Sequence, residues 1–531
     1  MAFFSLASRI TATGLLFLAL LNCHNGFAAN NEQTLIMTGS AIETCTTLSP
    51  QLCKLYAPLG SEKSAVFALS SDAIARVKQQ WPTDNQNHLA ATVTNLKTLA
   101  TTHPELLSKR ELLWAWRDIA NLQMSELSQL EFEYVIDMLQ VAQPDGQNRV
   151  LNIDAKNSKA DQNWLADSYK FIAASLKVKA QSPKLLVISA ASRDPDFAAS
   201  YYESVLSQVG VTVQWLALTP ALAQAITAGQ CDALDEYRTQ SMSLYNRETV
   251  FPKRVATEQA LCEQGIEQLI TKIKGSTGVV LAGDHDQQNL YRSFFDEQSK
   301  PYPWLSAVRD TPVLIAENQS AEFLAMEHII NQQQNAADVL NSDDIAHRAG
   351  LNSVDFAFIK SQFSETNSTA LITKALQSTN QQAGLGIDAN TALVIIKSKQ
   401  GDLMTVLGER GVIGLTANTE QNFSYSYWPS SSVFHYSNKV FSLNKRSAEN
   451  ALPNIKIPSL PTQRFSNILT NNKLRSLTQA MCLSQDTAAV GQQDGFLVNL
   501  NAIEATTYKR INATQFGCAI EQLAITFFAI E

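Results

Sequence analysis

Short apolar runs alternate with amphipathic helical segments from Lys184 onward, and this pattern limits the chain to a few folds. In most of these runs the apolar residues follow one another without polar alternation, as in strands that are buried on both faces. The pattern predicts βαβ units and an α/β three-layer sandwich, with a mainly parallel sheet between two layers of helices. The runs are KLLVIS (184–189), VTVQWL (211–216), GVVLAG (278–283), VLIA (313–316) and TALVII (391–396).

The functional site of such a sheet lies at the carboxyl ends of its strands. Three segments follow predicted strands and would meet there: the loops 189–195 and 282–287 and the turn around Ser320. Ser320 stands between an apolar strand and a segment, Phe323–Ile330, whose apolar residues have helical spacing. A strand, a tight turn with a central serine and a helix is the arrangement that exposes a nucleophile above a sheet. Ser320 is therefore either a nucleophile or a hydroxyl that remains on an inert turn.

The first 28 residues are typical of a signal peptide. Arg9 precedes the apolar run Leu15–Leu21, and small residues up to Ala28 offer a cleavage site. The run is shorter than the roughly 20 apolar residues that span a bilayer. A lipid anchor on Cys23 is the alternative. No later segment has transmembrane character, so we expect an exported protein, periplasmic or secreted.

Charge and motifs exclude several classes of partner and cofactor. The net charge is −8 and the isoelectric point is near 5.5, whereas nucleic-acid binding requires a basic surface. The sequence contains no Walker loop, no GxGxxG, no HExxH and no zinc spacing. We therefore expect no nucleic-acid partner, no cofactor and no metal.

Apart from Cys23, the cysteines fall into three sequence-local pairs. An even number of cysteines in an exported chain favours disulfides. Zinc is the rival interpretation, but no two cysteines have the C-x₂₋₄-C spacing of zinc sites and no histidine cluster accompanies them. Proximity in the sequence favours the pairs Cys45–Cys53, Cys231–Cys262 and Cys482–Cys518.

The residue pattern divides the chain into five parts. After the signal peptide (1–28), residues 29–60 contain a first strand and a cysteine loop. Residues 61–180 have helical spacing and read as a helical insertion. Residues 181–442 carry the alternating strands and helices. Residues 443–531 begin with a linker rich in Pro and Asn and form a C-terminal extension.

Several stretches, in this order, resemble the cyanophycinase family of serine exopeptidases. The resemblance covers roughly Thr34–Leu415, and it implies a class I glutamine-amidotransferase-like sandwich with the helical insertion of long, exported members. It also implies a Ser–His–acid triad that releases β-aspartyl-arginine dipeptides from cyanophycin. The stretches are LLVISAASRDPDFAASYYESVLSQVGV (185–211), VVLAGDHDQQNL (279–290) and GLGIDANTALVIIKSKQGDLMTVLGERGVIGL (384–415).

The chain departs from this family at the catalytic positions. The family's Gly-Thr-Ser-Ala-Gly elbow is matched by Asn-Gln-Ser-Ala-Glu at 318–322, which keeps Ser320 but replaces both glycines. Glu322 also brings a carboxylate close to where negative charge would develop. Gln362 stands where the family has its base histidine, and a carboxamide cannot accept the serine proton. The acid member of the triad stays open among Asp338, Asp343 and Asp344.

The family's Gly-Gly-Asp-Gln substrate loop is matched by residues 284–287. Asp286 and Gln287 are kept and would bind an amide or guanidinium group, although Asp286 also fits as the cap of the next helix. His285 follows a strand, so it would replace the missing base if it reaches Ser320. The alternative is a solvent-exposed loop histidine.

Two further features have plain structural interpretations. His328 would lie about 12 Å along a helix from Ser320, which excludes it as a base. The aromatic run Phe423–Trp428 alternates at a period of two, which favours a half-buried strand over a carbohydrate platform.

Two functions follow from the sequence. In the first, the protein is a divergent serine exopeptidase for aspartyl peptides of the β-aspartyl-arginine type. Ser320 attacks, His285 acts as a displaced base and Gln287 orients the substrate, with impaired activity because of Gln362. In the second, it is a non-catalytic exported protein that uses the same crevice for a peptide ligand containing Asp or Arg. The oligomeric state stays open.

Overall fold

The structure is a computed structural model. It describes residues 32–42, 45–46, 53–55, 65–142, 162–207, 210–283, 286–330, 335–342, 345–366, 368–379, 381–399, 401–419, 421–453, 455, 458, 465–512 and 517–530. The predicted signal peptide and Cys23 lie outside the described residues.

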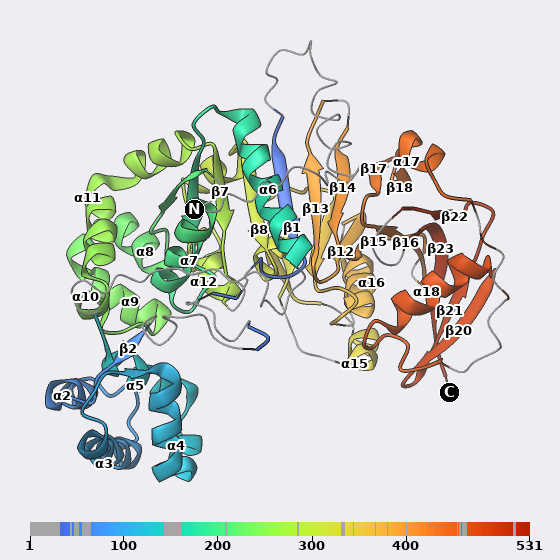
Figure 1. Ribbon diagram of the computed structural model, residues 1–531. Helices are drawn as coiled ribbons and strands as arrows, with labels where there is room; N and C mark the ends of the chain where they lie inside the picture. The colour runs from blue at the N-terminus through green and yellow to red at the C-terminus, as the bar shows by residue number, and fades with distance from the viewer. Residues whose placement is uncertain are drawn as a thin grey trace, which may run out of the picture. The chain divides into compact units, whose positions relative to one another are not determined.

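Strands from both ends of the α/β region form the first sheet, in the order β18-β17-β14-β13-β1-β8-β7-β5-β6 (Figure 1). The strands from β1 to β6 in this order are parallel, whereas β13, β14, β17 and β18 are antiparallel. The sheet is therefore mixed, and the predicted parallel arrangement holds for one half of it. The strands are β1 (Thr34–Thr38), β5 (Lys184–Ile188), β6 (Thr212–Trp215), β7 (Gly278–Leu281), β8 (Val313–Glu317), β13 (Thr391–Ile396), β14 (Leu403–Gly408), β17 (Val433–Ser437) and β18 (Val440–Leu443).

Helices pack on both faces of this sheet. Side chains alternate between the faces of a strand, so Leu35 and Ile36 of β1 lie in different cores. Two helices, α6 (Gln162–Lys179) and α7 (Pro195–Ser207), contribute to the core around Ile36. The opposite core contains residues of α8 (Pro220–Ala228), α9 (Leu234–Met242), α11 (Pro252–Lys274), α12 (Gln287–Arg292) and α13 (Leu305–Arg309). The three layers are those that the apolar runs predict.

A second sheet, mostly antiparallel, contains the C-terminal strands. Its order is β11-β12-β15-β16-β23-β21-β20-β19, and β22 pairs with β23. The residues predicted to form a C-terminal extension thus continue a sheet that begins within the α/β region. The strands are β11 (Ala357–Ser361), β12 (Ala383–Ile387), β15 (Gly411–Ala417), β16 (Asn422–Pro429), β19 (Phe465–Ser466), β20 (Ala488–Gln493), β21 (Phe496–Asn501), β22 (Thr507–Arg510) and β23 (Cys518–Ala529).

The aromatic run forms β16, a strand as expected, but it is buried on both faces instead of one. Tyr425 and Tyr427 lie in a core with α15 (Ala336–Asn341), α16 (Ser368–Ser378) and α18 (Lys473–Ser484). On the other face, the ring of Trp428 stacks on Phe434 with 3.9 Å between ring centroids. A strand with a helical layer on one side and another sheet on the other has no solvent-facing side, so its period-two pattern does not report exposure.

The helical insertion consists of α2 (Ser71–Gln79), α3 (Gln86–Thr102), α4 (Lys109–Glu126) and α5 (Gln129–Leu139), with short strands β2 (Val66–Phe67), β3 (Leu107–Ser108) and β4 (Gln140–Val141). Capping boxes at Ser108–Glu111 and Ser128–Glu131 begin α4 and α5. These helices share a core around Trp116 and Tyr134. Helix α6, although predicted as part of the insertion, packs on the first sheet instead.

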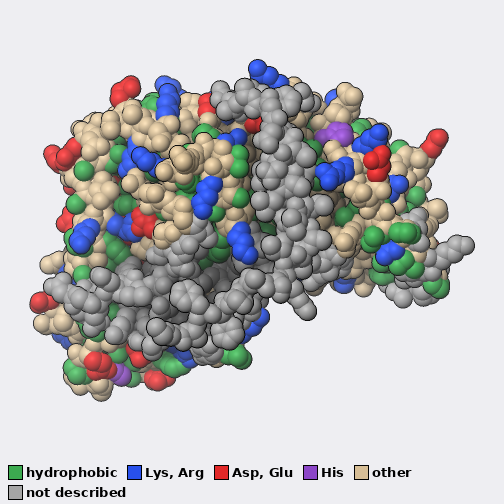
Figure 2. Space-filling view, turned by 45° about the horizontal axis from the view of Figure 1, so that its top comes forward, with side chains coloured by type: hydrophobic (Ala, Val, Ile, Leu, Met, Phe, Trp, Pro, Cys, Tyr) green, Lys and Arg blue, Asp and Glu red, His purple; other side chains and the backbone are tan. Residues whose placement is uncertain are grey.

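Three disulfides join Cys45–Cys53, Cys231–Cys262 and Cys482–Cys518, the pairs that proximity in the sequence favours. Within the described ranges, no helix combines the length and the apolar character needed to cross a bilayer. Basic and acidic side chains are interspersed on the face that Figure 2 shows. One short helix, α17 (Lys445–Glu449), lies where the sequence suggests a linker.

Candidate functional site

Loops that follow five different strands meet at the carboxyl edge of the first sheet. The amide of Asn318 donates to Thr38 O at 2.8 Å, that of Gln362 donates to Gly39 O at 3.1 Å, and that of Asp286 donates to Ala191 O at 2.8 Å. A side chain at Gly39 would place its Cβ 2.1 Å from Asp388 O, so this close backbone packing requires glycine. The loops after β1, β5, β7, β8 and β11 therefore form one continuous surface.

The strained residue of the turn after β8 is Asn318, two residues before Ser320. Asn318 has φ 48° and ψ −126°, a backbone conformation that side-chain-bearing residues rarely adopt, and helix α14 (Gln319–Glu322) follows at once. The sequence places Ser320 at the apex, whereas the structure places it inside the short helix. The predicted helix Phe323–Ile330 is absent, and β9 (Glu327–Ile329) pairs there with β10 (His347–Ala349).

The missing helix has a physical reason. Phe323, Leu324 and Ala325 are consecutive and all buried, whereas an amphipathic surface helix needs an exposed face. Tertiary burial therefore overrides the helical spacing of these apolar residues. His328 lies in β9 and not on a helix, so its distance from Ser320 along a helix no longer excludes it as a base. Its described ring contacts are with Tyr291 and Phe323, and it makes no described contact with Ser320.

Ser320 is fully buried, and its hydroxyl donates a hydrogen bond to the carbonyl of Gly283 at 2.8 Å. A serine nucleophile must instead pass its proton to a base such as imidazole. Within the described part of the chain, no imidazole is hydrogen-bonded to Ser320. The candidate base His285 lies outside the described residues. The hydroxyl is thus oriented by a main-chain carbonyl that cannot accept its proton.

Gln362 contacts Asn318 and not Ser320. It also has a left-handed backbone, with φ 46°, and its Nε2 donates to Asn318 Oδ1 at 3.0 Å. Two carboxamides therefore face each other at the strained apex of the turn. Neither group is a nucleophile of useful strength or a base near neutral pH.

Glu317, the last residue of β8, places a carboxylate among three hydrogen-bond donors at this edge of the sheet. Its carboxylate is 1% exposed and accepts hydrogen bonds from the amides of Gly283 and Ile42, both at 3.0 Å, and from the Tyr202 hydroxyl. Preorganised backbone amides of this kind stabilise developing oxyanions in hydrolases. Here the chain supplies its own anion to them. Sequence reasoning missed Glu317, although a charged residue at the end of an apolar strand is the signal.

Glu322 is turned toward β11, where an ion pair with Lys360 balances its negative charge. Its carboxylate pairs with Lys360 Nζ at 3.0 Å and accepts from the Ser361 hydroxyl at 2.7 Å. Gln287, kept from the family's substrate loop, donates to Gln319 O at 3.0 Å and to Glu322 at 3.4 Å. Gln287 therefore lies beside the turn, as the predicted crevice requires, but its amide is bound to the protein itself.

The two remaining aspartates have local contacts. Asp286 caps α12 by accepting from the Asn289 amide at 2.8 Å, and burial raises the pKa of its carboxyl while that hydrogen bond lowers it. Asp338 is exposed near the start of α15 and pairs with Asn335. No described contact links Asp338 to Ser320, and the other acid candidates, Asp343 and Asp344, lie outside the described residues.

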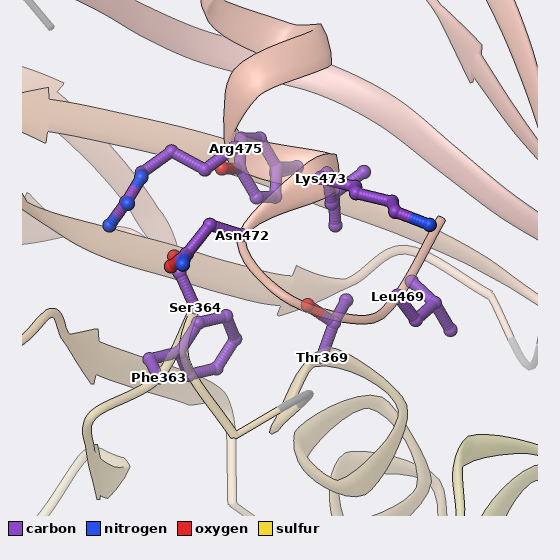
Figure 3. Close-up of a pocket in the computed structure, with 9 residues that line it drawn as sticks. Phe363, Ser364, Thr369, Leu469, Asn472, Lys473 and Arg475 are labelled. Atoms are coloured by element: carbon purple, nitrogen blue, oxygen red, sulfur yellow. The ribbon is translucent and has the colours of Figure 1, made fainter. Parts of the chain in front are cut away.

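A buried charge network adjoins the Gln362 loop, and Figure 3 shows one of its members, Arg475, near Ser364 of that loop. Arg475 of α18 pairs with Asp388 at 2.5 Å and with Glu365 at 3.3 Å, and Glu365 also pairs with Arg410. Burial raises the pKa of Asp388 to about 6, although Arg475 opposes the rise. No sequence pattern predicts this role for Arg475, because it comes from the C-terminal segment and is 110 residues away from Glu365.

Next to this network is a cavity of about 10 Å³, lined in part by Ser364, Asn472 and Arg475. That volume holds about one water molecule, so the cavity is too small for a peptide. On the other side of the edge, the Arg193 guanidinium pairs with Glu133 at 3.0 Å and with Asp137 at 2.8 Å. The helical insertion thereby fixes the loop after β5. In the described ranges, no group of three or more His, Cys, Asp or Glu side chains could hold a metal ion.

Comparisons with known proteins add little to this site. No protein-family model and no curated protein matches the chain. Among solved structures, the chain is similar to one titled "Crystal structure of a peptidase from an acI-B1 Actinobacterium", with 13% identity and a TM-score of 0.33. The match covers 51% of this chain and 91% of that chain. A TM-score of this size does not establish a common fold, so the similarity carries no conclusion about activity.

Proposed function

We propose that this chain is an exported peptide-binding protein that does not hydrolyse its ligand, built on an α/β sandwich like those of serine exopeptidases. The observation that carries the proposal is the pair of carboxamides at the apex of the turn after β8. Gln362, at the position where the resemblance expects the base, holds Asn318 at 3.0 Å, and a carboxamide cannot accept the proton of a serine nucleophile.

Two further contacts support the absence of hydrolysis. The Ser320 hydroxyl is buried and donates to the Gly283 carbonyl at 2.8 Å. The amides of Gly283 and Ile42, two backbone donors at this edge, are already occupied by the Glu317 carboxylate. Attack by Ser320 would require its hydrogen bond to Gly283 to break before the chemical step.

The composition of the edge supports a peptide as the ligand. Several carboxamides lie at this edge, and Gln287, Gln319, Gln362 and Asn390 are half-buried. A carboxamide both donates and accepts hydrogen bonds, as a peptide group does. Beside their internal bonds, Gln287, Gln362 and Asn390 each keep further donor or acceptor positions with which to pair with a peptide backbone. The resemblance to cyanophycinases suggests a ligand that contains aspartyl and arginyl residues.

A probe for active serines tests the loss of hydrolysis. We expect a fluorophosphonate to label the wild-type chain no more than the Ser320→Ala variant, because the hydroxyl lacks a base. A β-aspartyl-arginine peptide incubated with the protein should stay intact. Labelling or cleavage that disappears in Ser320→Ala would overturn the proposal.

Binding is measured separately, by calorimetric titration of the same peptide. We expect Gln362→Leu, which keeps the side-chain size but removes the amide, to weaken binding about tenfold through its lost hydrogen bonds. The exposed Gln298 offers a matched control, and Gln298→Leu should bind as the wild type does. Absence of binding, or equal binding by Gln362→Leu, would refute a peptide site at this edge.

A further inference from the structure

We propose that Arg475, contributed by the C-terminal segment, is a positioning residue of the candidate site that holds the Gln362 loop in its strained conformation. This inference stands apart from the proposed function, because it concerns the geometry of the loop and not the fate of a ligand. It assigns a role to the C-terminal segment, for which the sequence suggests none.

The loop at 362–366 needs an external support. Gln362 has φ 46°, and a left-handed backbone at a residue other than glycine persists only where the surroundings hold it. Within the loop, the amides of Glu365 and Thr366 both donate to the carbonyl of Gln362, at 3.1 and 3.0 Å. These bonds close the turn locally, and the amides of Gln362 and Phe363 fix its start by donating to Gly39 O at 3.1 Å and to Ile387 O at 3.2 Å. Among the described residues, no strand forms a backbone hydrogen bond with residues 364–366, so this part of the loop needs a further fixation.

Carboxylates on both sides of Arg475 provide that fixation. Asp388 accepts from the Ser364 amide at 3.2 Å, and Glu365 accepts from the Ala389 amide at 3.2 Å. The Arg475 guanidinium binds both carboxylates, at 2.5 and 3.3 Å. One cation thus bridges the loop after β11 and the turn after β12. Asp388 is completely buried, so without Arg475 its charge would lose this close counter-ion.

The helix that carries Arg475 is itself firmly anchored. Leu474, Leu477 and Met481 of α18 lie in the core of the second sheet, and Cys482 at the end of the helix is joined to Cys518. At its start, the Asn472 amide donates to Ser364 O at 3.0 Å, and Figure 3 shows Asn472 and Ser364 side by side. The C-terminal segment therefore contacts the loop through backbone and side chain, from a fixed position.

The chain contains a matched control for the loss of a buried arginine. Arg238 of α9 is 4% exposed, as is Arg475, and it also pairs with two carboxylates, Glu258 at 2.9 Å and Asp235 at 2.8 Å. Glu258 is buried, like Asp388. Removal of Arg238 thus leaves the buried carboxylate of Glu258 without its counter-ion, at a place outside the loops of the carboxyl edge.

Hydrogen exchange of the full chain, read by mass spectrometry, tests the role. In Arg475→Met we expect the amides of residues 363–366 to exchange at least about tenfold faster than in the wild type, because the loop opens locally. Residues 313–317 of β8 should keep their protection. In Arg238→Met the protection of 363–366 should equal that of the wild type, even where overall stability falls.

Equal exchange of the loop in Arg475→Met and in the wild type would overturn the proposal. So would equal acceleration in both arginine variants, because that pattern indicates a purely global effect. If Arg475→Met does not fold, the double variant Arg475→Met/Asp388→Asn also removes the buried charge of Asp388, which would otherwise lack its counter-ion. The same local acceleration is expected in that double variant, and a fully protected loop would refute the positioning role.

Discussion

Glu317→Ala is expected to lower the free energy of unfolding by about 3–5 kcal/mol, measured by guanidinium denaturation. The substitution leaves two backbone amides and the Tyr202 hydroxyl without their acceptor in a buried place. Each buried donor that is left without a hydrogen-bond acceptor lowers the free energy of unfolding by about 1–3 kcal/mol. Partial entry of water would keep the loss below the sum of these costs.

Added formate should restore much of this loss. A formate ion carries the carboxylate that Glu317→Ala lacks, and the three donors remain in place to bind it. We expect the thermal midpoint of Glu317→Ala to rise with formate concentration while that of the wild type does not. Glu449, which pairs with Lys445 at an exposed position, provides the control. Glu449→Ala should cost less than about 1 kcal/mol and show no formate response. A loss as small as this in Glu317→Ala would mean that the carboxylate does not hold its three donors in place.

The parallel half of the fold can be predicted from sequence because its signal is local. The apolar runs of β5, β7 and β8 are flanked by helical spacing, and their burial on both faces is what uninterrupted apolar runs indicate. The same rule fails at Phe323–Ala325, where three consecutive residues are buried by contacts with distant segments. Helical spacing alone does not reveal such contacts.

The site was predictable in its place but not in its contacts. The rule that loops gather at the carboxyl edge correctly brings Gln287, Ser320 and Gln362 to one region. It does not give the backbone angle that makes Asn318 the apex, because asparagine and serine are both common in turns. Arg475 could not be found, since its partners Asp388 and Glu365 come from segments far away in the sequence.

The second large effect is expected in acid. His328 is 5% exposed and packs against Phe323, with 5.6 Å between ring centroids. Burial lowers the pKa of its imidazole from the ordinary 6.5 to about 4; nearby Arg348 and Lys360 act in the same direction, and Glu322 opposes them. Between these two values the unfolded chain binds more protons than the folded chain. The contribution of His328 to stability is therefore complete above pH 6.5 and is lost as the pH falls through 4, in total about 3 kcal/mol.

The comparison of wild type with His328→Phe isolates this contribution, because other groups titrate in the same range. Asp388 acts with the opposite sign: its raised pKa, about 6, favours the folded chain at low pH and loses that effect as the pH rises through 6.

The free energy of unfolding is measured by denaturation at steps between pH 7.5 and 4. We expect the difference between wild type and His328→Phe to shift by about 3 kcal/mol toward the variant across this range. If wild type and His328→Phe lose stability in parallel as the pH falls, the imidazole is protonated in the folded chain without cost, and His328 cannot lie in the apolar contact between Phe323 and Tyr291.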